Sequence, residues 1–156
     1  MASADFLAAA RREKAFVWTT TKAALAAGET ALLIRVIQGT WNLHVEKIKV
    51  WVDSACEIAI HTTIDPATAL VGTAVTGKCL DRRGADTTLS ESKGDETGLS
   101  QGTIIEADYL VAKETKYFAY EGTLVIDNGK SIAVDCVHET EAIVTMWGYF
   151  KLASVG

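Results

Sequence analysis

Apolar and polar residues alternate in one segment after another between residues 15 and 152, and this alternation constrains the fold more than any other feature. A period of two residues places the apolar side chains on one face of a β-strand, whereas a helix would repeat every 3.6 residues. Clear examples are 43–52, 56–61, 103–111 and 142–152. Roughly nine such segments predict an all-β fold, an antiparallel β-sandwich of jelly-roll type, with a closed barrel as the main alternative.

Residues 1–14 differ from the rest because they are rich in alanine, with Phe6 and Leu7 as apolar anchors. We expect a short N-terminal arm, either helical or mobile, since an isolated helix of this length is marginally stable in water. If the arm is ordered, a contact must hold it, and in an oligomer a neighbouring subunit can provide that contact. Residues 15–156 are expected to form a single domain, because a chain of this length buries roughly 70% of its unfolded surface.

A polar tract at 81–102 interrupts the strands and predicts one long surface loop. Loops longer than about 12–15 residues are uncommon in compact domains and are usually functional or disordered. The tract is therefore either a projecting element that contacts a partner or a flexible insertion, and the sequence leaves both interpretations open. The charged residues of the tract that we expect to contact a partner are Arg82, Arg83, Asp95 and Glu96.

The tripeptide Asp127-Asn128-Gly129 is the strongest local turn signal in the chain. Asn-Gly tolerates the positive φ angles of a type I′ turn, which joins the two strands of a tight hairpin. We therefore expect residues 124–126 to pair with residues 132–134.

The net charge and the hydropathy of the chain argue against two classes of partner. The net charge of −5 argues against a general nucleic-acid binder, which needs a basic face to displace counterions from phosphates. No apolar run approaches the roughly 20 residues of a membrane span, and the first residues lack the pattern of a signal peptide. We therefore expect neither nucleic acid nor a membrane as a partner.

The three cysteines, Cys56, Cys79 and Cys136, each lie in an apolar strand pattern. An odd number of cysteines cannot all pair within one chain, so we expect buried free thiols, with a disulfide or a reactive thiol as the alternative. Free thiols fit synthesis in a reducing cytoplasm.

The chain contains residue types that support catalysis or metal binding, but they lack the spacing of a catalytic or metal-binding motif. His44, His61 and His138 are far apart, and none belongs to a His-x-His or His-x-x-x-His pair. The acidic residues of 81–102 do not match an EF-hand loop. We therefore expect no catalytic, cofactor or metal site, and a protein that is not an enzyme.

The tryptophan and tyrosine residues have three interpretations: core packing, an oligomer interface and stacking on sugar rings. The residues concerned are Trp18, Trp41, Trp51, Trp147, Tyr109, Tyr117, Tyr120 and Tyr149. Trp41 follows a turn and Trp51 lies between Val50 and Val52, so both are expected at the surface. Contact with another subunit would cover them there.

Several segments resemble small β-rich virion proteins encoded by tailed bacteriophages. They are Thr-Ala-Leu-Leu-Ile-Arg (30–35), Asn-Leu-His-Val-Glu-Lys-Ile (42–48), Val-Gly-Thr-Ala-Val-Thr-Gly (71–77), Gly-Asp-Glu-Thr-Gly (94–98) and Asp-Asn-Gly-Lys-Ser-Ile-Ala-Val-Asp (127–135). The resemblance covers residues 15–152 in general character and implies an accessory structural protein of the particle. Capsid decoration (cement) proteins of this size are commonly β-sandwiches or jelly rolls and are often trimeric, and neck, tail or fibre components look similar. The resemblance transfers no active-site residues.

We therefore expect a capsid decoration protein that forms a homotrimer and stabilises the shell by bridging capsid subunits. Its expected partners are copies of itself and the major capsid protein or other virion proteins, and its expected location is the virion, after synthesis in the host cytoplasm. The residues expected at the contacts are Phe6, Leu7, Trp41, Trp51, Arg82, Arg83, Asp95 and Glu96. A carbohydrate-binding β-sandwich module is the main alternative, and a small β-sandwich hydrolase is a more distant one.

Overall fold

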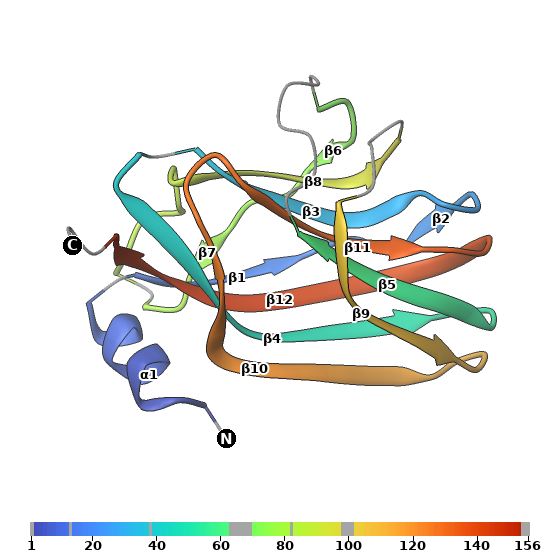
Figure 1. The fold of residues 1–156 in the computed structure, drawn as a ribbon, viewed down its shortest axis with the longest axis horizontal. Helices are drawn as coiled ribbons and strands as arrows, with labels where there is room; N and C mark the ends of the chain where they lie inside the picture. The colour runs from blue at the N-terminus through green and yellow to red at the C-terminus, as the bar shows by residue number, and fades with distance from the viewer. Residues whose placement is uncertain are drawn as a thin grey trace.

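Two antiparallel sheets stacked face to face form the body of the molecule, and one helix lies at its N-terminal end (Figure 1). The computed structural model describes residues 2–12, 14–37, 39–62, 70–81, 83–97 and 102–153. The described strands form two separate sheets, which confirms the predicted all-β sandwich over the barrel.

Each sheet contains six strands. Sheet A has the order β10 (Thr115–Ile126), β4 (Trp41–Val52), β12 (Thr140–Leu152), β1 (Ala15–Thr19) and β7 (Lys78–Cys79), and β2 (Ala23–Leu25) also pairs with β12. Sheet B has the order β6 (Thr73–Ala74), β8 (Ser90–Glu96), β3 (Thr30–Val36), β11 (Ser131–Cys136), β5 (Cys56–Thr62) and β9 (Thr103–Leu110).

Four antiparallel strand pairs are nested along the chain: β1 with β12, β3 with β11, β4 with β10, and β5 with β9. The chain therefore doubles back like one long hairpin, whose strand pairs are divided between the two sheets. The segment between β5 and β9 lies at the closed end of this hairpin, and we call it the insertion. It supplies β7 to sheet A and β8 and β6 to sheet B.

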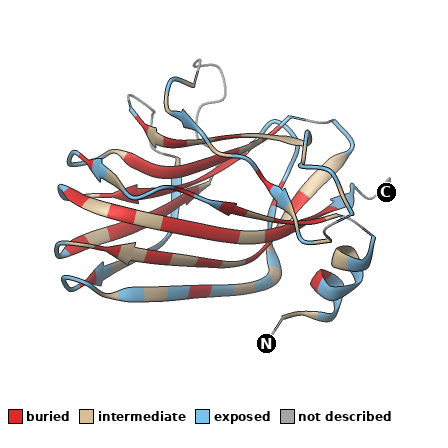
Figure 2. Ribbon diagram, turned by 180° about the vertical axis from the view of Figure 1, so that it is seen from behind, coloured by how far each residue is buried: buried red, intermediate tan, exposed pale blue. Residues whose placement is uncertain are grey.

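Apolar side chains from the facing sides of both sheets form the core, as the alternation requires. The rings of Phe16, Trp18 and Phe150 meet there with centroids 5.7–6.2 Å apart. Figure 2 shows that buried residues concentrate in the central strands and exposed residues at the periphery. All residues of β11 are buried in the middle of sheet B, and Leu70 of the insertion packs on Ala133 at the outer face of this sheet.

The predicted N-terminal arm is a helix, α1 (Ala4–Arg11), which the same chain holds in place. Ser3 caps the helix, since its Oγ accepts a hydrogen bond from the Phe6 amide at 3.2 Å. Ser3 also donates from its amide and its Oγ to the carboxylate of Glu46, at 2.5 and 2.8 Å. The Phe6 ring packs edge-on against Tyr149, 6.3 Å between centroids. The ordered arm therefore does not depend on a neighbouring subunit.

The prediction of one unstructured loop at 81–102 is wrong for its second half, because β8 runs through it and pairs with β3 and β6. The sequence of β8, Ser-Glu-Ser-Lys-Gly-Asp-Glu, contains no large apolar residue, so alternation does not reveal it. Main-chain hydrogen bonds to β3 hold it in the sheet. Residues 73–79 contribute two short strands, β6 and β7, which belong to different sheets.

The predicted hairpin around Asp127-Asn128-Gly129 is wrong, because β10 lies in sheet A and β11 in sheet B. The turn carries the chain from one sheet to the other. Lys130 donates its amide to the Asp127 carbonyl at 3.0 Å, and Gly129 has φ +74°. Asn128 does not have positive φ, so the turn is not of type I′.

Candidate functional site

The sandwich has two unlike edges. At one edge, the insertion covers β1 and β3 with the short strands β6 and β7 and with β8. At the other edge, β9 of sheet B and β10 of sheet A each have one neighbouring strand among the described residues, and they span 8 and 12 residues. We call these the covered edge and the open edge.

Apolar side chains are exposed along the open edge. In β9 every residue from Thr103 to Ala107 is exposed, and only Leu110 is buried. Ile104 and Tyr109 expose 55% and 58% of their surface. Further exposed apolar residues at this edge are Ile105, Val111 and Val125. Figure 2 shows the same exposure along β10, the lowest strand of the view.

Side chains connect the two strands of the open edge where main-chain hydrogen bonds do not. Tyr120 of β10 donates its hydroxyl hydrogen bond to the Glu106 carboxylate of β9 at 2.6 Å. Lys116 of β10 forms an ion pair with Asp108 of β9. Burial, followed by the hydrogen bond to Glu106, raises the pKa of Tyr120, so its hydroxyl remains a donor. These contacts align β9 with β10 and leave their outer edges available to a partner.

Irregular register explains why both faces of β9 are exposed. Ile60 and His61 of β5 are opposite Glu106 and Ile104, so Ile105 is the extra residue of a bulge. A second irregularity, between Ala119 and Leu124, bends β10 at the left of Figure 1. Gly122 has φ +78° at this bend, and its carbonyl accepts a hydrogen bond from His44 Nδ1 at 3.0 Å.

The predicted contact residues Trp41 and Trp51 lie at opposite ends of β4 and are both half-buried. Trp41 lines a groove of about 640 Å³ between α1 and the end of β12, and Lys14 Nζ lies 5.0 Å from the centre of its ring. Trp51 lies on the outer face of sheet A, beside Lys22 and Lys113. The structure therefore places the two residues at the surface, as expected, but at separate sites.

Phe6 and Leu7 lie on different sides of α1. Phe6 is buried against Tyr149 and Ala15, so it anchors the helix to its own sandwich. Leu7 is 51% exposed and remains accessible to a partner. Of the two predicted arm contacts, Leu7 alone projects outward.

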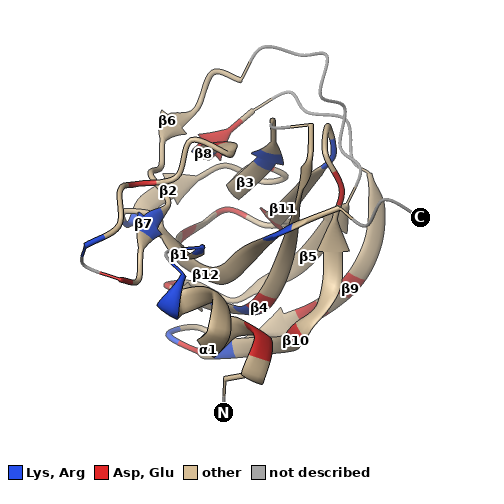
Figure 3. Cartoon of the chain, turned by 90° about the vertical axis from the view of Figure 1, so that its left-hand side faces the viewer, with Lys and Arg blue, Asp and Glu red and all other residues tan. Residues whose placement is uncertain are grey.

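The charged residues predicted at 81–102 have different environments. Arg83 donates to the carboxylate of Asp81, and Lys78 pairs with Asp86 at 2.6 Å, so charges of both signs surround β7 (Figure 3). Asp95 lies in β8 with φ +52°. Arg82 lies outside the described residues.

Glu96 is buried, contrary to its expected position on a loop. Its carboxylate accepts hydrogen bonds from the amides of Val71 and Gly72 at 2.8 and 2.7 Å. Glu96 therefore ties the segment that precedes β6 to β8 within the insertion and does not present a charge to a partner.

The three histidines lie in separate environments. His44 stacks on Tyr149 with ring centroids 4.9 Å apart, and His138 Nδ1 accepts the Glu57 amide hydrogen bond at 3.3 Å. Buried His61 lies with Nε2 3.0 Å from the carboxylate of Asp135. Burial raises the pKa of Asp135, which also accepts a hydrogen bond from a threonine hydroxyl.

Cys56 and Cys136 are buried free thiols, as predicted, and Cys79 is a half-buried one. Burial raises the pKa of Cys136, which keeps its thiol protonated and unreactive.

Residues 98–102 have the sequence Gly-Leu-Ser-Gln-Gly, which matches the Gly-x-Ser-x-Gly motif of a nucleophile elbow. Residues 98–101 lie outside the described residues. An elbow leads into a helix, whereas this segment leads directly into strand β9. The structural context therefore differs from that of a hydrolase elbow.

The described part of the chain contains no group of three or more His, Cys, Asp or Glu placed to hold a metal ion. None of its helices is long and apolar enough to cross a membrane.

Comparison of the chain with models of known protein families, with characterised proteins and with solved structures finds no match.

Sequence reasoning missed the open edge and the lysine residues that border the surface aromatic rings. Adjacent Ile104 and Ile105 break the alternation of their strand, and this local signal marks the bulge. The lysine contacts depend on which residues are opposite one another on neighbouring strands, and that register is not encoded by local pattern.

Proposed function

We propose that the sandwich is a jelly roll. The nested pairing of β1, β3, β4 and β5 with β12, β11, β10 and β9 supports this, because a jelly roll consists of eight strands in two sheets with such Greek-key connections. The architecture occurs in viral capsid and lectin domains. It is therefore compatible with a structural role in a particle and with glycan binding.

We infer that the protein is a structural subunit of a tailed-bacteriophage virion, of the capsid decoration type, and not an enzyme. The open edge is the observation that carries this proposal. A long edge strand with unpaired main-chain groups and exposed apolar side chains is a template for association. At the covered edge, by contrast, the insertion of the same chain shields the sheets with β6, β7 and β8.

The proposed role is mechanical. Copies of the chain form a homotrimer and contact the major capsid protein, with the open edge facing a neighbouring subunit. A stable interface buries about 1,200–2,000 Å² in total, and the two strands of the open edge provide its apolar centre. A protein that binds only the assembled shell stabilises that shell by mass action.

The test combines light scattering with co-sedimentation on empty capsids of the encoding phage. The wild type should have the mass of three 16.7 kDa chains and sediment with capsids. Ile104→Lys places a charge at the open edge and should weaken assembly or capsid binding by on the order of tenfold or more. The matched control is Val71→Lys, because Val71 is 72% exposed at the covered edge and should tolerate the charge.

A wild-type protein that is monomeric and does not bind capsids would contradict the proposal. Equal effects of the two substitutions would contradict the assignment to the open edge. Binding to purified tails in place of capsids would instead make the protein a neck, tail or fibre component.

A further inference from the structure

The outer face of sheet A carries aromatic rings and lysine side chains in neighbouring positions, and the one helix of the described residues, α1, lies at the end of the sandwich (Figure 1). The rings belong to Trp51, Tyr117 and Trp147, and the lysines are Lys47 and Lys49. We call this set the aromatic–lysine face. It spans β10, β4 and β12, where Tyr117 is opposite Lys49 and Trp147 is opposite Lys47.

Each lysine of the face lies beside a ring. Lys47 Nζ is 4.5 Å from the centre of the Trp147 ring and 5.9 Å from that of Tyr117. Lys49 Nζ is 6.0 Å from the Tyr117 ring, the outer limit of a cation–π contact. Trp51 and Trp147 are half-buried, and Tyr117 is 56% exposed. The rings therefore reach the surface next to positive charges.

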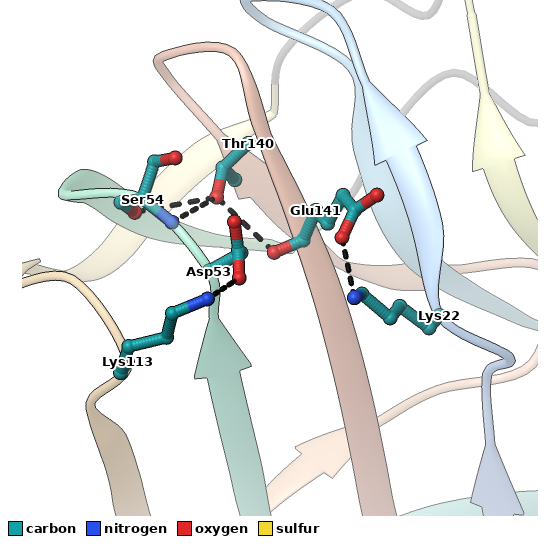
Figure 4. A network of polar contacts seen from close by, with 6 residues as sticks. All are labelled: Lys22, Asp53, Ser54, Lys113, Thr140 and Glu141. Carbon is teal, nitrogen blue, oxygen red and sulfur yellow. Dashed lines mark hydrogen bonds and ion pairs between the residues drawn. The ribbon is translucent and has the colours of Figure 1, made fainter.

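Lys47 and Lys49 form no ion pair with any carboxylate in the described parts of the chain. The lysines beside Trp51 differ, because Lys22 pairs with Glu141 and Lys113 with Asp53 (Figure 4). The hydrogen bond to Glu141 raises the pKa of Lys22, and that from Lys113 lowers the pKa of Asp53. Two charges at the centre of the face are thus available to an anionic ligand, while those at its end are neutralised.

We propose that the aromatic–lysine face binds an acidic polysaccharide. Aromatic rings stack on the apolar faces of sugar rings, and the ammonium groups of Lys47 and Lys49 bind carboxylate groups of the chain. The two lysines are two residues apart on β4, roughly 7 Å along the strand, which suits a ligand whose charges are sparse. This site lies on the outer face of sheet A and shares with the open edge only strand β10, which carries Tyr117.

Single-stranded nucleic acid also combines stacking with negative charge, but the face fits it less well. Every nucleotide carries a phosphate, so binding needs a continuous basic groove along the backbone. On this face, Lys47 and Lys49 are the two lysines without a carboxylate partner among the described residues, and Glu141 and Asp53 place negative charge at the Trp51 end. The charge pattern therefore favours a polymer in which the anionic groups alternate with neutral surface.

The experiment is a titration of the full chain with alginate oligosaccharides, followed by tryptophan fluorescence and calorimetry. Neutral dextran and oligo(dT) are the comparison ligands. Wild type should bind alginate with micromolar to millimolar affinity, weakened by salt, and should not bind dextran. Trp51→Ala and the double variant Lys47→Gln/Lys49→Gln should each lower the affinity by on the order of tenfold.

The matched control is Lys93→Gln/Lys130→Gln, which removes the same charge away from the face and should bind alginate as the wild type does. Unchanged melting temperatures would show that the variants are folded. Equal losses in the control and face variants, or the absence of alginate binding, would overturn the proposal. Tighter binding of oligo(dT) than of alginate would overturn it in favour of a nucleic-acid site.

Discussion

The two edges of the sandwich solve the same physical problem in opposite ways. A terminal strand exposes unpaired main-chain groups, and proteins normally shorten, charge or cover it. At the covered edge, the insertion ends both sheets with strands of two residues, β6 and β7. At the open edge, strands of 8 and 12 residues remain uncovered.

The difference between the two edges shows where the insertion completes the fold and where it does not. The covered edge is shielded by the same chain, because β7 and β8 of the insertion pair with β1 and β3. Within the insertion, buried Glu96 accepts hydrogen bonds from two main-chain amides. At the open edge, the polar contacts between β9 and β10 in the described residues are those of Glu106 and Asp108. An edge that a single chain leaves incomplete is the natural place for a partner.

The sharpest test of this comparison exchanges one carboxylate at each edge for alanine. Glu96→Ala removes a buried carboxylate and the two part-buried hydrogen bonds that it accepts, and should cost about 3 kcal/mol of unfolding free energy. Glu106→Ala removes one exposed hydrogen bond and should cost less than about 1 kcal/mol. Urea denaturation measures both values, and equal costs would show that the two edges do not differ in this way.

A second test concerns the bend of β10 at the open edge. Gly122 has φ +78°, and a Cβ there would lie 2.5 Å from the Tyr149 hydroxyl oxygen. Gly122→Ala should therefore cost about 2 kcal/mol, through backbone strain and displacement of the ring that holds α1. Gly28→Ala is the control, since Gly28 has φ +82° and no atom within 4 Å of such a Cβ. Thermal unfolding should show a smaller loss for the control, and similar losses would exclude a role for the Tyr149 contact.

The turn that leads from the open edge into sheet B gives a third test. Gly129 has φ +74° with no atom near the Cβ position, so Gly129→Val should cost about 1 kcal/mol from backbone strain alone. Gly39→Val is the control, because Gly39 does not have positive φ. Melting temperatures of the two variants compare the sites, and an unchanged value for Gly129→Val would show that the turn relaxes.

The sequence allowed the covered core to be predicted better than the edges. Alternation at 43–52 and 142–152 matches β4 and β12 closely, because one buried face imposes a period of two. β8 was missed because main-chain hydrogen bonds and not apolar packing hold it. The turn signal at Asn128-Gly129 correctly indicates positive φ at the glycine but does not reveal that the flanking strands belong to different sheets.

The candidate sites were predictable only in part. Trp41 and Trp51 reach the surface as expected, since their neighbours in the alternation face the core. The pairing of Lys47 with Trp147 was not predictable, because those residues are 100 positions apart and meet only through the register of β4 and β12. The hydrogen bonds of Glu96 to the amides of Val71 and Gly72 were likewise not predictable, because no local pattern brings these residues together.

The smallest expected effect concerns the surface of the insertion beside β7. Hydrogen bonds from Arg83 lower the pKa of Asp81 from 3.8 to about 2. Because the pKa in the folded state is below that in the unfolded state, ionised Asp81 contributes stability above about pH 4, and this contribution is lost as the pH falls toward 2. Asp81→Asn removes it, so the difference in unfolding free energy between wild type and variant should shrink between pH 5 and pH 2. Arg83 is largely exposed, so solvent screening keeps the difference below that of the glycine variants. Denaturation at several pH values measures it, and a difference that is constant over this range would mean that the Asp81–Arg83 contact does not stabilise the covered edge.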